Sequence, residues 1–191
     1  MDNLSWSEAL NRLKEGNARF VSDRLLYKKQ DSSRREQTSR GQHPFAIILS
    51  CADSRVVPEL TFDTGLGELF VVRVAGNVAN TSSIASIEYA VANLGVPLIV
   101  VMGHEGCGAV TAAIDGSDAG PNLNHLLSMI RPAVDNVEDK SVNTVVKENA
   151  KRNAKAIMEK SGIISSAANN SNVKIITGFY HLKSGNVDFD I

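Results

Sequence analysis

Three residues of types that bind zinc stand just after two apolar stretches of this sequence. Cys51 follows the apolar run 45–49, and His104 and Cys107 follow the apolar run 97–102. Thiolate sulfur and neutral imidazole are the ligands that zinc prefers. A catalytic zinc has three protein ligands and leaves its fourth position to water or substrate. These three residues therefore predict a zinc site with one open position.

Other interpretations of the same side chains stay open. One is a disulfide between Cys51 and Cys107, although small disulfide-stapled domains are shorter than this chain and richer in cysteine. Taken singly, Cys51 could be an ordinary buried thiol and His104 a core histidine bonded to backbone. A structural zinc needs four protein ligands, and Asp53 could complete such a set.

Asp53 and Arg55 follow Cys51 at alternating positions, so in an extended segment their side chains lie on the same side. Two thiolates cancel the charge of Zn²⁺, and a nearby group must then favour bound hydroxide. Asp53 can do so by accepting a hydrogen bond from that hydroxide. Arg55 can hold Asp53 in a bidentate ion pair and keep it ionised. We expect Arg55 to decide whether Asp53 stays off the metal or closes the site.

The elements that position these residues are predicted from hydrophobic patterns. Four nearly continuous apolar runs rich in Val and Ile predict strands covered on both faces, at residues 45–50, 69–74, 98–102 and 173–180. A helical pattern at 82–94 lies between the second and third and implies parallel pairing. Ser184 and Gly185 predict a turn into an antiparallel edge strand at 186–189. The predicted class is α/β, a central mostly parallel sheet of four strands plus an antiparallel edge strand, flanked by helices.

Outside the sheet, helical periodicity predicts four further helices, at about residues 5–21, 107–114, 122–130 and 142–160. The third of these is expected to end before Pro132, which cannot continue a helix without losing a hydrogen bond. Residues 165–172 are predicted to form a polar loop. Segment 22–42 is polar and mixed in charge, and is predicted to be an arm with one short helix.

Composition limits the class of protein. A length of 191 residues with 43% hydrophobic side chains fits one domain, 1–191. A formal net charge of -1 gives no attraction to nucleic acid or anionic membranes, and no apolar run is long enough for a membrane span. We expect a cytoplasmic protein whose partners are small molecules or copies of itself. An exported origin with a trimmed leader remains an alternative.

The two motifs together carry a resemblance. Cys51-x-Asp53-x-Arg55 followed by His104-x-x-Cys107 resembles the zinc and aspartate–arginine signature of the β-class carbonic anhydrases. The likeness continues through residues 69–77, 87–90 and 100–104 to residues 178–180, near the end of the chain. The paired motif is far more specific than either half alone.

This resemblance implies the reversible hydration of carbon dioxide to bicarbonate and a proton by zinc-bound hydroxide. It implies one Zn²⁺ per subunit, with Cys51, His104 and Cys107 as ligands, and a catalytic dyad of Asp53 and Arg55. Two alternatives keep the metal: hydrolysis of a related linear molecule such as carbon disulfide or carbonyl sulfide, and a noncatalytic zinc-binding protein in which Asp53 fills the fourth position.

The resemblance also implies substrate-binding residues and an assembly. Gln42 matches a glutamine that hydrogen-bonds substrate, and the backbone N–H of Gly108 matches a second donor. Phe70 and Tyr89 match positions that line a narrow apolar pocket. The family unit is a dimer, so we expect a homodimer or dimer-based oligomer in which the N-terminal helix and arm, residues 1–41, pack on the partner subunit.

Overall fold

A single five-stranded sheet forms the centre of the computed structural model, which describes residues 4–190. Residues 1–3, at the start of the predicted N-terminal segment, and residue 191 lie outside the described residues. The strand order is β2-β1-β3-β4-β5. The strands are β1 (Ala46–Ser50), β2 (Leu69–Arg73), β3 (Leu98–His104), β4 (Lys174–Tyr180) and β5 (Val187–Asp190). The first four are parallel and β5 is antiparallel to β4, which confirms the predicted class.

The two central parallel strands bring the metal-type residues to one edge of the sheet. Every residue of β1 and β3 is buried, as expected for strands covered on both faces. Ser50 of β1 pairs in register with Met102 of β3. Cys51 therefore leaves the sheet beside the last residues of strand β3. This carboxyl edge of the sheet is where ligands bind in open α/β sheets.

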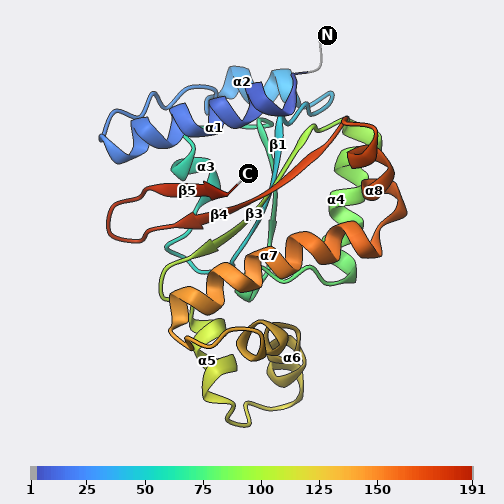
Figure 1. Ribbon diagram of the computed structural model, residues 1–191. Coiled ribbons are helices and arrows are strands. Elements are labelled where there is room, and N and C mark those ends of the chain that lie inside the picture. Colours follow the sequence, from blue (N-terminus) through green and yellow to red (C-terminus); the bar gives the residue numbers. More distant parts are fainter. Residues whose placement is uncertain (1–3, 191) are drawn as a thin grey trace.

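Helices cover both faces of the sheet (Figure 1). One face packs on α1 (Trp6–Val21) through a core that contains Leu10 and Leu13. The other face packs on α4 (Thr81–Leu94), α7 (Val142–Lys160) and α8 (Gly162–Asn169). The remaining helical segments are α2 (Ser32–Thr38), α3 (Pro58–Thr61), η1 (Ala75–Asn77), α5 (Gly108–Asp115) and α6 (Pro121–Asp135).

The first helix begins with a capping box. The side chain of Ser5 accepts a hydrogen bond from the backbone of Glu8, and the Glu8 carboxylate accepts one from the backbone of Ser5. The apolar face of α1 is covered by the same chain, because Leu10 and Leu13 are buried against the sheet. That face therefore gives no reason of its own to place α1 on a partner subunit.

Two predicted boundaries were wrong, and packing explains both. Residues 165–169 of the predicted polar loop 165–172 belong to helix α8, because Ile164 is fully buried against the sheet core and Ser161 caps the helix start. Helix α6 continues to Asp135 through Pro132, since the buried Ala133 and Val134 extend its apolar face beyond the proline. The four-residue helix α3 was not predicted.

Helices α5 and α6 lie together at one end of the molecule, at the bottom of Figure 1. Val110 of α5 and Ile130 of α6 belong to the buried cluster that includes Cys51 and Cys107. The metal-type residues thus sit where the carboxyl edge of the sheet meets these two helices. Within residues 4–190, none of the helices is both apolar enough and long enough to cross a membrane.

Candidate metal centre

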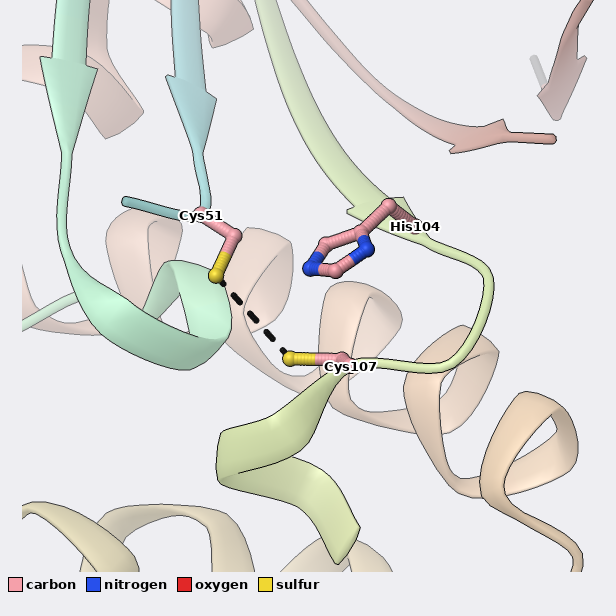
Figure 2. A group of neighbouring side chains, drawn as sticks. All are labelled: Cys51, His104 and Cys107. Atoms are coloured by element: carbon pink, nitrogen blue, oxygen red, sulfur yellow. Dashed lines mark hydrogen bonds between the residues drawn. The ribbon is translucent and has the colours of Figure 1, made fainter. Parts of the chain in front are cut away.

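Cys51, His104 and Cys107 converge on one point although they come from separate parts of the chain (Figure 2). Their ligand atoms all lie within 4.8 Å of one another. Cys51 is 4% exposed, His104 0% and Cys107 1%. The structure therefore brings together, in a buried place, the three residues that the sequence singled out.

Strand ends and a tight turn position the three side chains. Cys51 directly follows β1, and His104 is the last residue of β3. Gly106 has a φ of +60°, which turns the chain sharply so that Cys107 becomes the residue before α5. The backbone N–H of Gly106 donates to Asn143 Oδ1 at 3.1 Å and ties this turn to the start of α7.

The histidine is oriented as a metal ligand would be. Nδ1 of His104 lies 2.9 Å from the carbonyl oxygen of Glu105. A carbonyl can only accept, so Nδ1 carries the proton and Nε2 presents its lone pair. Nε2 is buried and has no hydrogen-bond partner among residues 4–190. A metal ion would satisfy this acceptor, and a backbone bond on the other ring nitrogen is the usual arrangement for a ligating histidine.

The two sulfurs lie 3.9 Å apart, much farther than a disulfide bond allows, and both cysteines are free. A hydrogen bond from the Cys107 thiol lowers the pKa of Cys51 to about 4 although burial opposes it, and the Gly76 N–H also donates to this sulfur. The neighbouring Cys51 sulfur and burial raise the pKa of Cys107. Ionising both sulfurs at this distance would need a cation between them, so the donor set fits zinc.

Asp53 lies beside the donors and is held by Arg55. The guanidinium donates to the carboxylate through Nε at 2.9 Å and Nη2 at 2.7 Å, and the backbone N–H of Arg55 donates at 2.9 Å. Oδ2 of Asp53 is 3.8 Å from His104 Nε2. The Arg55 hydrogen bonds hold the pKa of Asp53 well below its usual range, although partial burial opposes them. The carboxylate is therefore ionised and directed toward the metal-facing nitrogen.

Sequence reasoning missed Arg73, which braces the Cys51–Asp53 turn. Arg73 is the last residue of β2, and its side chain donates to the carbonyl oxygens of Cys51 at 3.1 Å and Asp53 at 2.6 Å. The sequence did contain a signal for this role: a positively charged side chain at the carboxyl end of an apolar strand. The carboxyl ends of parallel strands meet at one edge of the sheet, so Arg73 could be expected near Cys51.

The residues expected to bind substrate are more scattered. Gly108 begins α5 directly after Cys107, so its backbone N–H lies next to one of the candidate metal ligands. Gln42 is exposed and precedes β1, at the opposite end of that strand from Cys51 and roughly 15 Å away along it. Phe70 of β2 packs against Tyr89 of α4, with ring centroids 6.4 Å apart. Within one chain, Gln42 does not join the metal-type cluster.

Comparisons with known proteins agree with this geometry. A family model described as "Carbonic anhydrase" matches residues 46–187. Carbonic anhydrase 2 of Mycobacterium tuberculosis is 46% identical over 138 residues, covering 70% of this chain and 67% of that protein.

Solved structures match over more of the chain. The β-carbonic anhydrase CcaA superposes with a TM-score of 0.74 at 29% identity, over 94% of both chains. The fold also matches a tetrameric β-carbonic anhydrase from Sordaria macrospora, with a TM-score of 0.69 at 24% identity, covering 82% of this chain and 89% of that one. The match to the family model and the shared fold lead to one conclusion: this chain belongs to the carbonic anhydrase family, in its β class.

Proposed function

We propose that this protein catalyses the reversible hydration of carbon dioxide to bicarbonate and a proton. The observation that carries this proposal is the buried Cys51–His104–Cys107 cluster with the ionised Asp53 beside it, in a chain of the carbonic anhydrase family. Hydrolysis of carbon disulfide or carbonyl sulfide is not favoured, because the matched relatives and structures are named carbonic anhydrases.

We propose one zinc ion per subunit, held by Cys51, His104 and Cys107. When bound, zinc acts as a Lewis acid that makes a water molecule more acidic near neutral pH. The chain itself supplies two cysteine sulfurs that would bind the ion as thiolates, a neutral imidazole with its free lone pair at Nε2, and a buried setting. The Gly76 N–H, 3.3 Å from the Cys51 sulfur, stabilises the charge on that thiolate.

Asp53 and Arg55 are proposed to act as a dyad on the reacting water. Asp53 is ionised, so its carboxylate can accept the water's proton in a hydrogen bond and turn an oxygen lone pair toward the carbon of carbon dioxide. Arg55 takes up both carboxylate oxygens and keeps Asp53 from joining the metal ligands. The site is then open rather than closed by Asp53.

The substrate contacts are proposed to come from two chains. The Gly108 N–H belongs to the same chain as the ligands and can donate to an oxygen of the substrate. Gln42 lies at the far end of β1 from Cys51, so we propose that it serves the metal site of a second copy. Phe70 and Tyr89 are proposed to line that shared pocket, since Tyr89 is 51% exposed in a single chain and offers apolar surface to a partner.

This arrangement requires at least a homodimer. Strand β2 pairs with β1 on one side and lies at the edge of the sheet described for residues 4–190. It is apolar and only half-buried, which supports pairing of its outer edge with a second copy. We also propose that the protein acts in the cytoplasm. Two free cysteines 3.9 Å apart are preserved best where thiols are kept reduced.

Stopped-flow hydration of carbon dioxide by protein of measured zinc content tests the proposal. Between about pH 6.5 and 9, activity should rise with pH as the reacting water loses its proton. Parallel assays with carbon disulfide and carbonyl sulfide examine the related substrates. Turnover of sulfur substrates alone would replace the proposal, and zinc-loaded protein without activity at any pH would indicate a noncatalytic zinc protein.

A further inference from the structure

A buried line of two asparagine amides connects helix α7 to the loop that touches the Cys51 sulfur. The backbone N–H of Ala79 donates to Asn153 Oδ1 at 2.7 Å, and Asn153 Nδ2 donates to Asn149 Oδ1 at 3.0 Å. Asn149 Nδ2 then donates to the carbonyl oxygen of Gly76 at 2.8 Å. The backbone N–H of Gly76 donates to Cys51 Sγ. The line therefore ends on a metal-type ligand.

The orientation of both amides follows from the partner at each end. Ala79 offers only an N–H, so Asn153 must turn its oxygen toward the loop. Its Nδ2 then faces Asn149, whose oxygen must accept, and the remaining Asn149 Nδ2 faces the Gly76 carbonyl. Asn149 is 1% exposed and Asn153 8%, so water offers little competition. Either amide turned around would place two acceptors or two donors together.

The loop at 75–79 needs outside support to keep its shape. Gly76 has a φ of +69° and Asn77, which is not glycine, has a φ of +44°, a backbone region that costs free energy for L side chains. A Cβ on Gly76 would lie 2.5 Å from Ile130 Cδ1, so the loop is also tightly enclosed. The two asparagines hold the loop at two points: at Gly76, the first residue of this left-handed pair, and at Ala79, just after the pair.

The hydrogen bond from the Gly76 N–H to the Cys51 sulfur links this support of the loop to a candidate metal ligand. A backbone donor to a metal thiolate withdraws charge from the sulfur, and such outer contacts tune both metal affinity and the acidity of a bound water. The position of the loop sets the length of this hydrogen bond, because a backbone N–H cannot move toward the sulfur independently of its loop. A loop that shifts by a few tenths of an ångström weakens the bond.

We propose that Asn149 and Asn153 are positioning residues that hold the Gly76 N–H on the Cys51 sulfur and thereby set how tightly the centre retains zinc. This inference deepens the proposed function and rests on it for the identity of the metal. Neither residue contacts the ligands, and both act through the loop.

Asn149→Leu is the sharpest test, since leucine has a similar shape and lacks the donor to Gly76. Two measurements report on the sulfur without turnover: the rate at which zinc passes to an excess of chelator, and the sulfur-to-cobalt charge-transfer absorption of the cobalt(II)-substituted protein. We expect zinc loss to be about 10–100-fold faster than in the wild type. We also expect the charge-transfer band to shift, because the sulfur has lost a hydrogen bond.

Asn17→Leu is the matched control. Asn17 is 4% exposed and bonds the backbone of Thr61, Gly185 and Val187, and it takes no part in the line of bonds that ends on the Cys51 sulfur. This substitution leaves at least as many buried backbone groups unpaired, so it should lower the free energy of unfolding at least as much. Its zinc loss and cobalt band should match the wild type.

Asn153→Leu covers the case in which Asn149→Leu does not fold. It removes the anchor at Ala79 and one of the bonds that orient Asn149, so we expect the same changes at a smaller amplitude. Unchanged zinc loss and an unchanged band in a folded variant at either position would overturn the inference, as would equal changes in Asn17→Leu. Failure of the proposed function looks different: wild-type protein loaded with zinc would not hydrate carbon dioxide, whatever the variants do.

Discussion

The metal half of the centre and the substrate half are built in different ways. Cys51, His104 and Cys107 come from one chain, meet at the carboxyl edge of the sheet and are at most 4% exposed. Gln42 and Tyr89 lie on the surface of the same chain, and Gln42 is at the other end of β1. A single chain therefore brings the three candidate metal ligands together, whereas the residues proposed to bind substrate stay apart from them.

This difference follows from how parallel strands end. All carboxyl ends of the parallel strands lie at one edge, so residues that follow β1 and β3 are brought together by the sheet itself. A residue before β1 belongs to the opposite edge and cannot reach the same point in its own chain. With the role proposed for Gln42, the substrate half depends on assembly, whereas the metal half does not.

The largest expected effect comes from removing a ligand. Cys107→Ser should lose zinc and with it most of the rate acceleration, which is on the order of 10⁶-fold or more for a typical enzyme. Metal analysis together with stopped-flow hydration measures both losses. Val110→Ala, which trims a buried neighbour of the same cluster, should lower stability and keep zinc. A Cys107→Ser protein with full zinc content would show that Cys107 is not a ligand.

Arg55→Ala tests the dyad within one chain. Without the guanidinium, Asp53 is free to turn onto the metal, because its Oδ2 is already 3.8 Å from His104 Nε2. Activity should fall by about 100–1,000-fold, the usual effect of losing one preorganised charged contact, while zinc is retained. A crystal structure should find Asp53 coordinated. An open site with unchanged kcat/KM would refute the role given to Arg55.

The division between one chain and two can be tested by mixing inactive variants. Gln42→Ala should lower kcat/KM by about 10–100-fold, as expected for a lost hydrogen bond to an oxygen that becomes negatively charged as bicarbonate forms. When this variant is unfolded and refolded with an equal amount of Cys107→Ser, mixed dimers contain one site with intact ligands and an intact Gln42 from the partner. Activity should recover to about one quarter of the wild-type value for random pairing.

Arg55→Ala mixed with Cys107→Ser is the control for that experiment. Arg55 acts beside the ligands of its own chain, so no mixed dimer has a complete site and no recovery is expected. Absence of recovery in both mixtures, with mixed dimers present by mass spectrometry, would place Gln42 in its own chain or outside the site.

The smallest expected effect concerns the arm that leads to Gln42. Glu68, just before β2, pairs with Lys29 of the arm and accepts from the Gly65 N–H. Burial raises the pKa of Glu68, but these hydrogen bonds outweigh it and leave the pKa below the ordinary value of 4.5. A lowered folded pKa gives stability that is present above about pH 4.5 and is lost as the pH falls through the folded value.

Glu68→Gln should therefore destabilise the protein by about 1 kcal/mol or less near neutral pH, because the pair is partly exposed, and its deficit should vanish in acid. Urea unfolding at a series of pH values measures this. A deficit that stays constant down to the acid limit would mean that the Lys29 pair contributes nothing. Metal content should not change, since Glu68 lies at the opposite edge of the sheet from the ligands.

Most of the fold could be predicted because its signals are local. The continuous apolar runs of β1 and β3 identify buried strands, and Ser184 with Gly185 predicts the turn to β5. Helix α8 was missed because its serines and asparagines look like a loop, and only the packing of Ile164 against the sheet makes the segment helical. The predicted end of α6 before Pro132 was wrong for a similar reason, since burial of the helix compensates for the one backbone hydrogen bond lost at the proline.

The sequence alone determined which side chains are the candidate metal ligands and from which strand ends they come, because residue type and spacing encode both for Cys51, His104 and Cys107. Only the tertiary structure decided how the centre is supported. Asn149 reaches Gly76 across 73 residues of chain, and in a helical sequence its amide looks like any solvated side chain. Hydrogen bonds at such separations depend on how helices dock on the sheet, and local sequence patterns do not carry that information.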